Sequence, residues 1–361
     1  MQEYALLGFG ILLVVAIVYF AIRNTIPVVP FLYANAIMQA ESRRSVSEKQ
    51  WPTLAESQSL SELTNCLRET DYAESIEQAK DIKEYHIAIE KSFAKTVEEL
   101  KEITPDSIDP LFDAYLMFWE SKMLKTFYRA FLTGQEIDEQ LVFPIGRITP
   151  SMLSHLKESE TLADMKVVMT GTPYEQVFQA EYDSLEEFEV ALDNFVFKHF
   201  VKKVEKTKVY EGDLVIQLLN FKFDVQNLLV LLKLEARDIP EEQRSKYLIK
   251  NDTIIHHLSN DLIKAKSIKD FVNICSRTHF SLPLTQALEK YEEDGSLSHF
   301  ERQLYTHFKK TVMKHEQLHF QGPYPLFTHL VKKELEMKNL MTISKGIDSK
   351  MPSTEIKELV I

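Results

Sequence analysis

The sequence contains little glycine, proline and cysteine. Among its 361 residues there are nine Gly, 13 Pro and two Cys, whereas average usage is about 7% for Gly and about 5% for Pro. Sandwiches rich in β-turns and flexible linker-rich chains need more of these residues, so both classes are excluded. Cys66 and Cys275 are too few for a disulfide framework or a four-thiolate zinc site, and we expect both to be small, buried apolar residues.

Basic residues are outnumbered as well. There are 42 Lys and Arg against 54 Asp and Glu, which gives a net charge of -12. A general nucleic-acid binder needs excess Lys and Arg to neutralise phosphates, so this class is excluded too. No Gly is followed by Lys and then Ser or Thr, and no G-x-S-x-G motif occurs, so we predict no bound nucleotide, no cofactor and no catalytic residue of these types.

One long uncharged run lies near the N-terminus. It extends over 18 residues from Ala5 to Ile22 and would form a helix about 27 Å long, close to the thickness of the bilayer hydrocarbon. No basic residue precedes the run, so a cleaved signal peptide is not predicted. Arg23, Arg43 and Arg44 follow it. The positive-inside rule therefore predicts a single-pass anchor in the cytoplasmic membrane, with the large body in the cytoplasm.

A short pattern occurs three times along the chain. Each copy has a hydroxyl residue, an aliphatic residue, an acid three positions after the hydroxyl, and later Thr-x-aromatic at constant spacing. The copies are Ser59–Leu63 with Thr70–Tyr72, Thr161–Met165 with Thr172–Tyr174, and Ser267–Phe271 with Thr278–Phe280. A hydroxyl followed three residues later by an acid is typical of a capped helix start.

A second feature recurs in the same order. The acids Glu120, Asp224 and Glu336 occupy matching positions, and successive copies are offset by about 102 to 112 residues, too long for a one-hairpin solenoid repeat. Apolar spacing near them is helical. We therefore predict an all-α protein with an anchor at 1–24 and three similar helical domains at 25–140, 141–248 and 249–361. The alternative is that any amphipathic helical chain aligns with itself.

Two interpretations of the three acids remain open. Each copy could offer its acid to one common central surface, an acidic face that attracts a basic partner. The acids could instead be helix-packing or capping residues that recur because the domain was copied.

Four segments carry a resemblance to a known family. They are Tyr33–Ala36, Ser59–Tyr72, Asp224–Leu232, and the ending formed by Glu334–Leu340 with Met351–Leu359. From about residue 30 onward the chain resembles the C subunits of archaeal A-type and bacterial V/A-type ATP synthases, which are homologous to the d subunit of the vacuolar proton pump. Ile37-Met38 stand where members usually carry a basic residue. Typical members are soluble, so the N-terminal helix is an addition.

The resemblance implies a fold and a role. The fold is three similar helical domains in a pseudo-threefold funnel, in agreement with the three copies. The role is non-catalytic: a rotor adaptor that sits on the membrane proteolipid ring and receives the foot of the central stalk, with Glu120, Asp224 and Glu336 as candidate contact residues. Because an anchor outside the ring would collide with the stator, we expect residues 5–22 to occupy the lumen of the ring, where Ile17 could be cross-linked.

One motif points to a different function. His315, Glu316 and His319 form an H-E-x-x-H pattern, which on a helix can bind zinc and activate water. Gly322-Pro323 follow closely and no third ligand is indicated, so helix-end histidines near carboxylates are the competing interpretation. A membrane-anchored zinc peptidase is thus the alternative function, and a generic membrane-tethered helical scaffold is a third.

Overall fold

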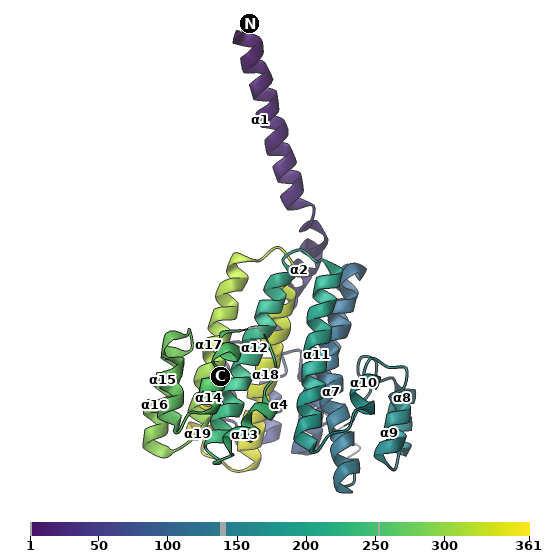
Figure 1. Ribbon diagram of the computed structural model, residues 1–361, viewed down its shortest axis with the longest axis vertical. Helices are drawn as coiled ribbons and strands as arrows, with labels where there is room; N and C mark the ends of the chain where they lie inside the picture. The colour runs from purple at the N-terminus through teal and green to yellow at the C-terminus, as the bar shows by residue number, and fades with distance from the viewer. Residues whose placement is uncertain (1, 138–141, 252) are drawn as a thin grey trace.

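The computed structural model describes residues 2–137, 142–251 and 253–361, and the side chains of residues 2–8 and 24 lie outside this description (Figure 1). The predicted seam at 140/141 and the side chain of Ala5 are therefore outside the described residues. In the described part the chain is all-α, as predicted, and its one β-type pairing is an isolated bridge between Ile145 and Ile148. The α-helices are α1 (Gln2–Thr25), α2 (Val29–Glu41), α3 (Trp51–Leu54), α4 (Leu60–Cys66), α5 (Ala73–Ile76), α6 (Ile82–Ile103), α7 (Asp109–Thr133), α8 (Pro150–Glu158), α9 (Leu162–Val168), α10 (Glu175–Gln179), α11 (Leu185–Thr207), α12 (Gly212–Glu235), α13 (Glu241–Arg244), α14 (Ile254–Ile263), α15 (Ile268–Ile274), α16 (Ser281–Asp294), α17 (Ser298–Leu318), α18 (Tyr324–Asp348) and α19 (Ser353–Leu359).

The three predicted helix starts are confirmed. The side chains of Ser59, Thr161 and Ser267 each accept a hydrogen bond from the backbone N–H three residues later, at 3.2, 3.2 and 3.1 Å. These bonds begin α4, α9 and α15. The three Thr-x-aromatic elements also share one geometry, in which the threonine hydroxyl donates to the carbonyl three residues earlier and accepts from the N–H of the aromatic residue.

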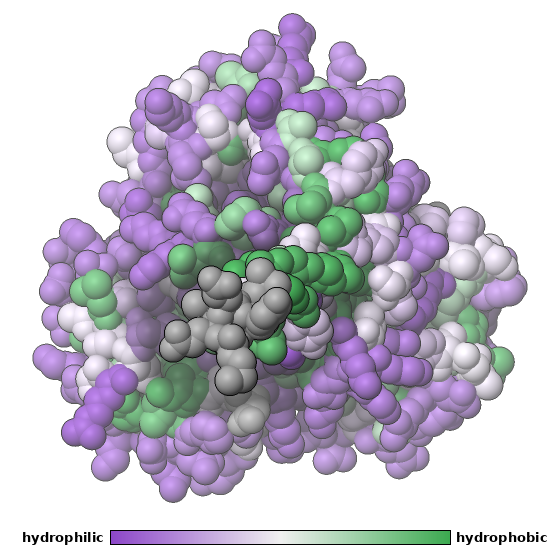
Figure 2. All heavy atoms as spheres, turned by 90° about the horizontal axis from the view of Figure 1, so that it is seen from above, coloured by the Kyte–Doolittle hydropathy of each residue, from purple (hydrophilic) through white to green (hydrophobic). Residues whose placement is uncertain are grey.

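Six long helices form the body and contact one another in cyclic order. Each copy supplies a hairpin: α6 with α7, α11 with α12, and α17 with α18. The second helix of each hairpin packs against the first helix of the next copy, and α18 returns to α6, which closes a ring. Figure 1 shows short helices such as α8, α9, α15 and α16 outside the long ones. Seen from above, the molecule has a three-lobed outline (Figure 2).

The three copies share one core. A single cluster of buried apolar side chains extends through all of them, and the matching residues Leu124, Leu228 and Leu340 are each 0% exposed. The division into three separate domains and the funnel shape stay predictions. Of the two cysteines expected to be buried, Cys275 is buried but Cys66 is exposed. Cys66 is the last residue of the short helix α4, in which Leu63 is the buried residue, so it lies off the face of α4 that packs inward.

The N-terminal helix projects from the body (Figure 1). Among the described residues one helix is long and apolar enough to cross a membrane, and that helix is α12, for which 56% of the apolar window is buried inside the protein. Within α1 the described apolar stretch, Phe9–Arg23, is shorter. Its side chains are uncovered, with Leu12 70% and Phe20 65% exposed. Neighbouring helices thus cover more than half of the apolar surface of α12, whereas the described side chains of α1, residues 9–23, are exposed.

Candidate interaction site at the centre of the helix ring

The recurring acids are buried where consecutive copies meet. Glu120 is 0% exposed and Glu336 is 8% exposed. Each receives a hydrogen bond from the Thr-x-aromatic element of the following copy: the hydroxyl of Tyr174 donates to Glu120 at 2.6 Å, and the hydroxyl of Tyr72 donates to Glu336 at 3.3 Å. Burial raises the pKa of both carboxyls. The acid of one copy is therefore part of the joint with the next.

Asp224 forms the corresponding joint with different partners. The aromatic residue of the third copy is Phe280, which has no hydroxyl, and Asp224 instead accepts hydrogen bonds from the side chains of Thr253 and, at 3.1 Å, Asn251. Asp224 is 3% exposed, and burial raises its pKa to about 6. A buried carboxyl with two neutral donors and no cation is costly to ionise.

This burial favours the packing interpretation of the three acids over direct contact with a partner. Glu336 also pairs with Lys333 at 2.8 Å, and Lys333 in turn pairs with Asp71 at 2.6 Å. All of these bonds connect one copy to another or one turn of α18 to the next. The assignment of Glu120, Asp224 and Glu336 as interface residues stays a prediction.

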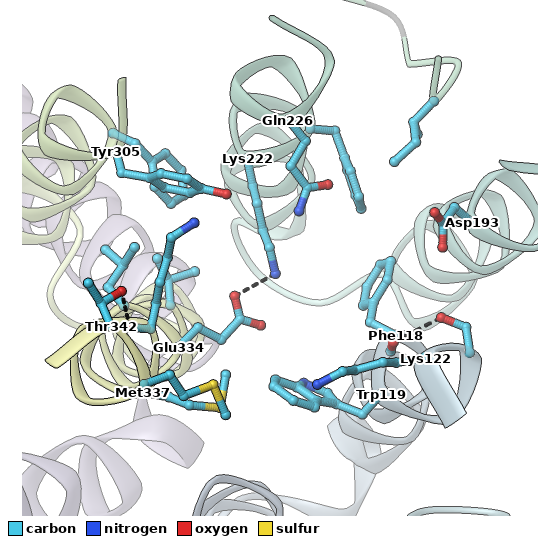
Figure 3. A pocket seen from close by; sticks show the side chains of 18 of the residues that line it. Phe118, Trp119, Lys122, Asp193, Lys222, Gln226, Tyr305, Glu334, Met337 and Thr342 are labelled. Atoms are coloured by element: carbon cyan, nitrogen blue, oxygen red, sulfur yellow. Dashed lines mark hydrogen bonds and ion pairs between the residues drawn. The ribbon is translucent and has the colours of Figure 1, made fainter. Parts of the chain in front are cut away.

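A cavity of about 680 Å³ lies between the long helices, and all six of them contribute side chains to it (Figure 3). Phe118 and Phe223 lie on its apolar side, 5.6 Å apart between ring centroids. Further aromatic rings continue from this pair into the protein: Phe200 packs on Phe118 at 6.1 Å and on Phe327 at 6.0 Å. The cavity is therefore closed on one side by packed aromatic rings.

Lysine dominates the charged lining of the cavity. Lys222 pairs with Glu334 at 2.5 Å and Lys125 with Asp193 at 2.5 Å. The remaining charged groups of the lining are lysines: Lys122, Lys338 and Lys345. Of the two interpretations left open for the recurring acids, an acidic central surface does not describe this cavity, whose lining carries five lysines against two carboxylates.

Helix geometry explains the difference. The cavity is lined by the residues two positions before and two positions after each acid, such as Lys222 and Gln226 on either side of Asp224. Successive residues turn by about 100°, so positions two before and two after a residue lie together on the opposite face of the helix. The spacing identified the correct helices, but it did not show which face meets the centre.

The cavity extends from the middle of the long helices toward the end of the body that is opposite α1. On the side of α1, the amide of Asn35 in α2 donates to the carbonyl of Gly322 at 3.0 Å, just before α18 begins. The lining of the cavity includes Thr342 and Lys345, which are near the other end of α18. From residue 322 to residue 345 a helix rises about 35 Å, so the two ends of the body offer separate surfaces.

Two of the three H-E-x-x-H side chains pair with other helices, and the third, His315, lines a separate pocket between α12 and α17. Glu316 pairs with Lys332 at 2.5 Å, and Nδ1 of His319 lies 3.1 Å from Glu211. His319 is the residue that ends α17, with non-helical backbone angles, so the two histidines do not share a continuous helical face. Among the described residues, no group of three or more His, Cys, Asp or Glu side chains is placed to hold a metal ion. The geometry gives the zinc alternative no support.

The fold and the site together define the class of protein: an all-α protein in which three helical hairpins surround one central cavity. Comparison of the sequence with known families makes this specific: residues 34–359 match the ATP synthase (C/AC39) subunit family. The chain belongs to this family, whose members are structural, non-catalytic components of the complex.

Three archaeal relatives are each named as the C subunit of an A-type ATP synthase. The protein of Methanocaldococcus jannaschii is 28% identical over 94% of this chain and 88% of the relative. That of Methanosphaera stadtmanae is 25% identical over 96% and 91%, and that of Methanothermobacter thermautotrophicus is 26% identical over 98% and 94%. The last alignment leaves only about 2% of this chain, roughly seven residues, unmatched, so it includes most of the apolar N-terminal run.

Proposed function

We propose that the chain is the rotor adaptor of a rotary A/V-type ATP synthase. It links the central stalk to the membrane proteolipid ring and transmits torque during ion-coupled ATP synthesis or hydrolysis. One observation carries the proposal: a helical body of this family encloses a cavity lined by all six long helices, and an uncovered apolar helix projects from one end of this body. The cavity is the socket for the stalk, and the apolar end faces the membrane.

The membrane end is apolar beyond α1 itself. Val29 and Leu32 of α2 are 53% and 48% exposed, and Phe320, in the turn before α18, is 54% exposed. From above, hydrophobic residues gather beside the N-terminal helix while hydrophilic residues cover the lobes (Figure 2). A single-pass helix at 5–22 followed by Arg23 would anchor this face with the body in the cytoplasm. Since the body rotates with the ring, the helix would lie in the lumen of the ring.

A torque-transmitting body must resist twisting. In this protein each long helix contacts at least two other long helices, α12 and α18 also contact each other, and buried hydrogen bonds connect the copies at every joint, as between Tyr174 and Glu120. Densely packed helices that are closed into a ring deform little. The architecture therefore suits the proposed role.

Site-directed cross-linking in the native complex tests the proposal. Cys66, which is exposed, is first replaced by Ser, and a single cysteine is then introduced at Ile17 or at Gln226. We expect the Ile17 cysteine to react with lumen-facing residues of the proteolipid ring, and the Gln226 cysteine to react with the central stalk. A matched cysteine at Lys246, on the periphery, serves as the control. Labelling of the Ile17 cysteine only from lipid outside the ring would reject the lumen position, and failure of the chain to co-purify with ring or stalk would reject the adaptor role.

A further inference from the structure

The central cavity is lined at three matching positions, one in each copy, by side chains of three different types: aromatic, basic and acidic. Two residues before each recurring acid stand Phe118, Lys222 and Glu334, all of which line the cavity. The ammonium of Lys222 lies 2.5 Å from a carboxylate oxygen of Glu334 and 5.8 Å from the ring centroid of Phe118. Figure 3 shows Lys222 reaching from its own helix toward Glu334.

This difference contrasts with the core. The matching positions 124, 228 and 340 are all leucine and all fully buried, and the positions of the recurring acids are all acidic. In the cavity, by contrast, the matching position on α7 is aromatic, whereas the matching positions on α12 and α18 carry a partly buried ion pair. At this level the three similar units thus present one aromatic and two charged side chains to whatever enters the cavity, although α7 also adds Lys122 and Lys125 to the lining and α12 adds Phe223.

The hydrogen-bonding groups of the cavity lining indicate which chemical groups a bound partner should carry. Both carboxylate oxygens of Glu334 are occupied, one by the hydroxyl of Tyr115 at 2.7 Å and the other by Lys222. An ammonium group has three donors, and the hydrogen bond of Lys222 to Glu334 uses one. One turn further along the three helices stand Lys122, Gln226 and Lys338. Lys122 pairs with Glu90 and Lys338 pairs with Glu301, and each ammonium group keeps further donors. A guest with carboxylate or carbonyl acceptors fits such a lining.

We propose that this polar asymmetry fixes the angular orientation of the central stalk in its socket, and that the entering end of the stalk carries acidic groups on the side that faces α12 and α18. The inference rests on the proposed function. A volume of about 680 Å³ is the size of a pocket for one small molecule, about 300–1,000 Å³, so on this proposal only a short tip of the stalk enters it. One orientation places the acceptors of the tip at Lys222 and its apolar side on Phe118; other orientations leave the lysine without a new acceptor.

A charge-swap variant tests the orientation directly. The double substitution Lys222→Glu with Glu334→Lys keeps an ion pair in place but exchanges its two sides. Thermal melts of the full chain in detergent should show that the swap recovers most of the stability that Lys222→Glu alone loses. Binding to the purified central-stalk proteins should nevertheless weaken at least tenfold. The control swap, Lys246→Glu with Glu187→Lys, reverses an ion pair away from the cavity and should leave binding unchanged.

A milder pair of variants keeps the test decisive if the swap does not fold. Gln226 is partly exposed at the mouth, so Gln226→Lys should tighten stalk binding several-fold and Gln226→Glu should weaken it several-fold, with both effects shrinking at high salt. Wild-type affinity in the folded swap, or equal affinities of the two Gln226 variants, would overturn the orientation proposal alone. Absence of binding by the wild-type chain would overturn the proposed function itself.

Discussion

Replacing Asp224 by asparagine should stabilise the protein at neutral pH. The carboxyl is 3% exposed, and burial raises its pKa from 3.8 to about 6. At 1.36 kcal/mol for each pKa unit, ionising this group in the folded protein costs about 3 kcal/mol at pH 7. Asparagine is neutral, and its carbonyl oxygen can still accept the hydrogen bonds from Asn251 and Thr253.

The sign of the pH dependence follows from linkage. Because the folded-state pKa lies above the unfolded value, the native protein binds the extra proton between about pH 4 and pH 6. Its free energy of unfolding therefore falls as pH rises through this interval and stays lower above it. Burial raises the pKa of Glu120 and Glu336 in the same direction, so the wild-type profile contains all three contributions, and the difference from Asp224→Asn isolates one.

Urea titrations of the full chain in detergent at pH 4.5 and pH 7.5 would measure this difference. We expect Asp224→Asn to raise the free energy of unfolding by about 2–3 kcal/mol at pH 7.5 and by less than about 1 kcal/mol at pH 4.5. Asp164→Asn is the control: that carboxyl is solvent-exposed, and the hydroxyl of Thr161 lowers its pKa, so the substitution should give no gain at pH 7.5. A loss of stability in Asp224→Asn that is equal at both pH values would refute the reasoning.

Three other substitutions probe the contacts between elements. Tyr174→Phe removes a 2.6 Å hydrogen bond to the fully buried Glu120 and should lower the free energy of unfolding by about 1.5–3 kcal/mol. Tyr72→Phe removes a 3.3 Å hydrogen bond to Glu336, which keeps Lys333 as a partner, and should lower it by only about 1 kcal/mol. Equal losses of stability in thermal melts of the two variants would contradict this ranking. Gly346→Ala should lower stability by about 1–3 kcal/mol, because the new methyl group would lie 2.7 Å from the side chain of Ile356. Adding Ile356→Val should recover part of this loss, and a double-mutant cycle that showed strict additivity would argue against the contact.

The sequence was sufficient to predict the elements that depend on local chemistry. A hydroxyl with an acid three residues later predicts a capped helix start, and Ser59, Thr161 and Ser267 each provide one. The recurrence of Glu120, Asp224 and Glu336 correctly indicated equivalent helices. These signals lie within a few residues, or repeat at a fixed offset, so they can be recognised without coordinates.

The lining of the cavity could not be predicted in the same way. Phe118, Lys222 and Glu334 share no chemistry, so no pattern relates them until the helices are placed around one centre. The recurring acids lie on the helix face opposite the cavity. They recur because each copy uses its acid for the contact with the next copy. A cavity that binds one asymmetric partner needs the three copies to differ. The informative residues were therefore those two positions before each acid, where the three copies carry different side chains.

The closing joint of the ring has a special mechanical position. Chain connections join the first copy to the second and the second to the third, but α18 and α6 meet only through side-chain and packing contacts. Bonds cluster at this joint: Lys333 with Asp71 at 2.6 Å, Tyr72 with Glu336 at 3.3 Å, and His86 with Ser344 at 2.9 Å. Lys333 is 2% exposed, whereas the side chain of Asp71 is 28% exposed and Lys333 keeps Glu336 as a second partner. Removing Asp71 should therefore cost less than the roughly 3–5 kcal/mol of a fully buried ion pair. Under torque an open ring would spread at this joint first, so this ion pair lies where the covalent chain gives no support.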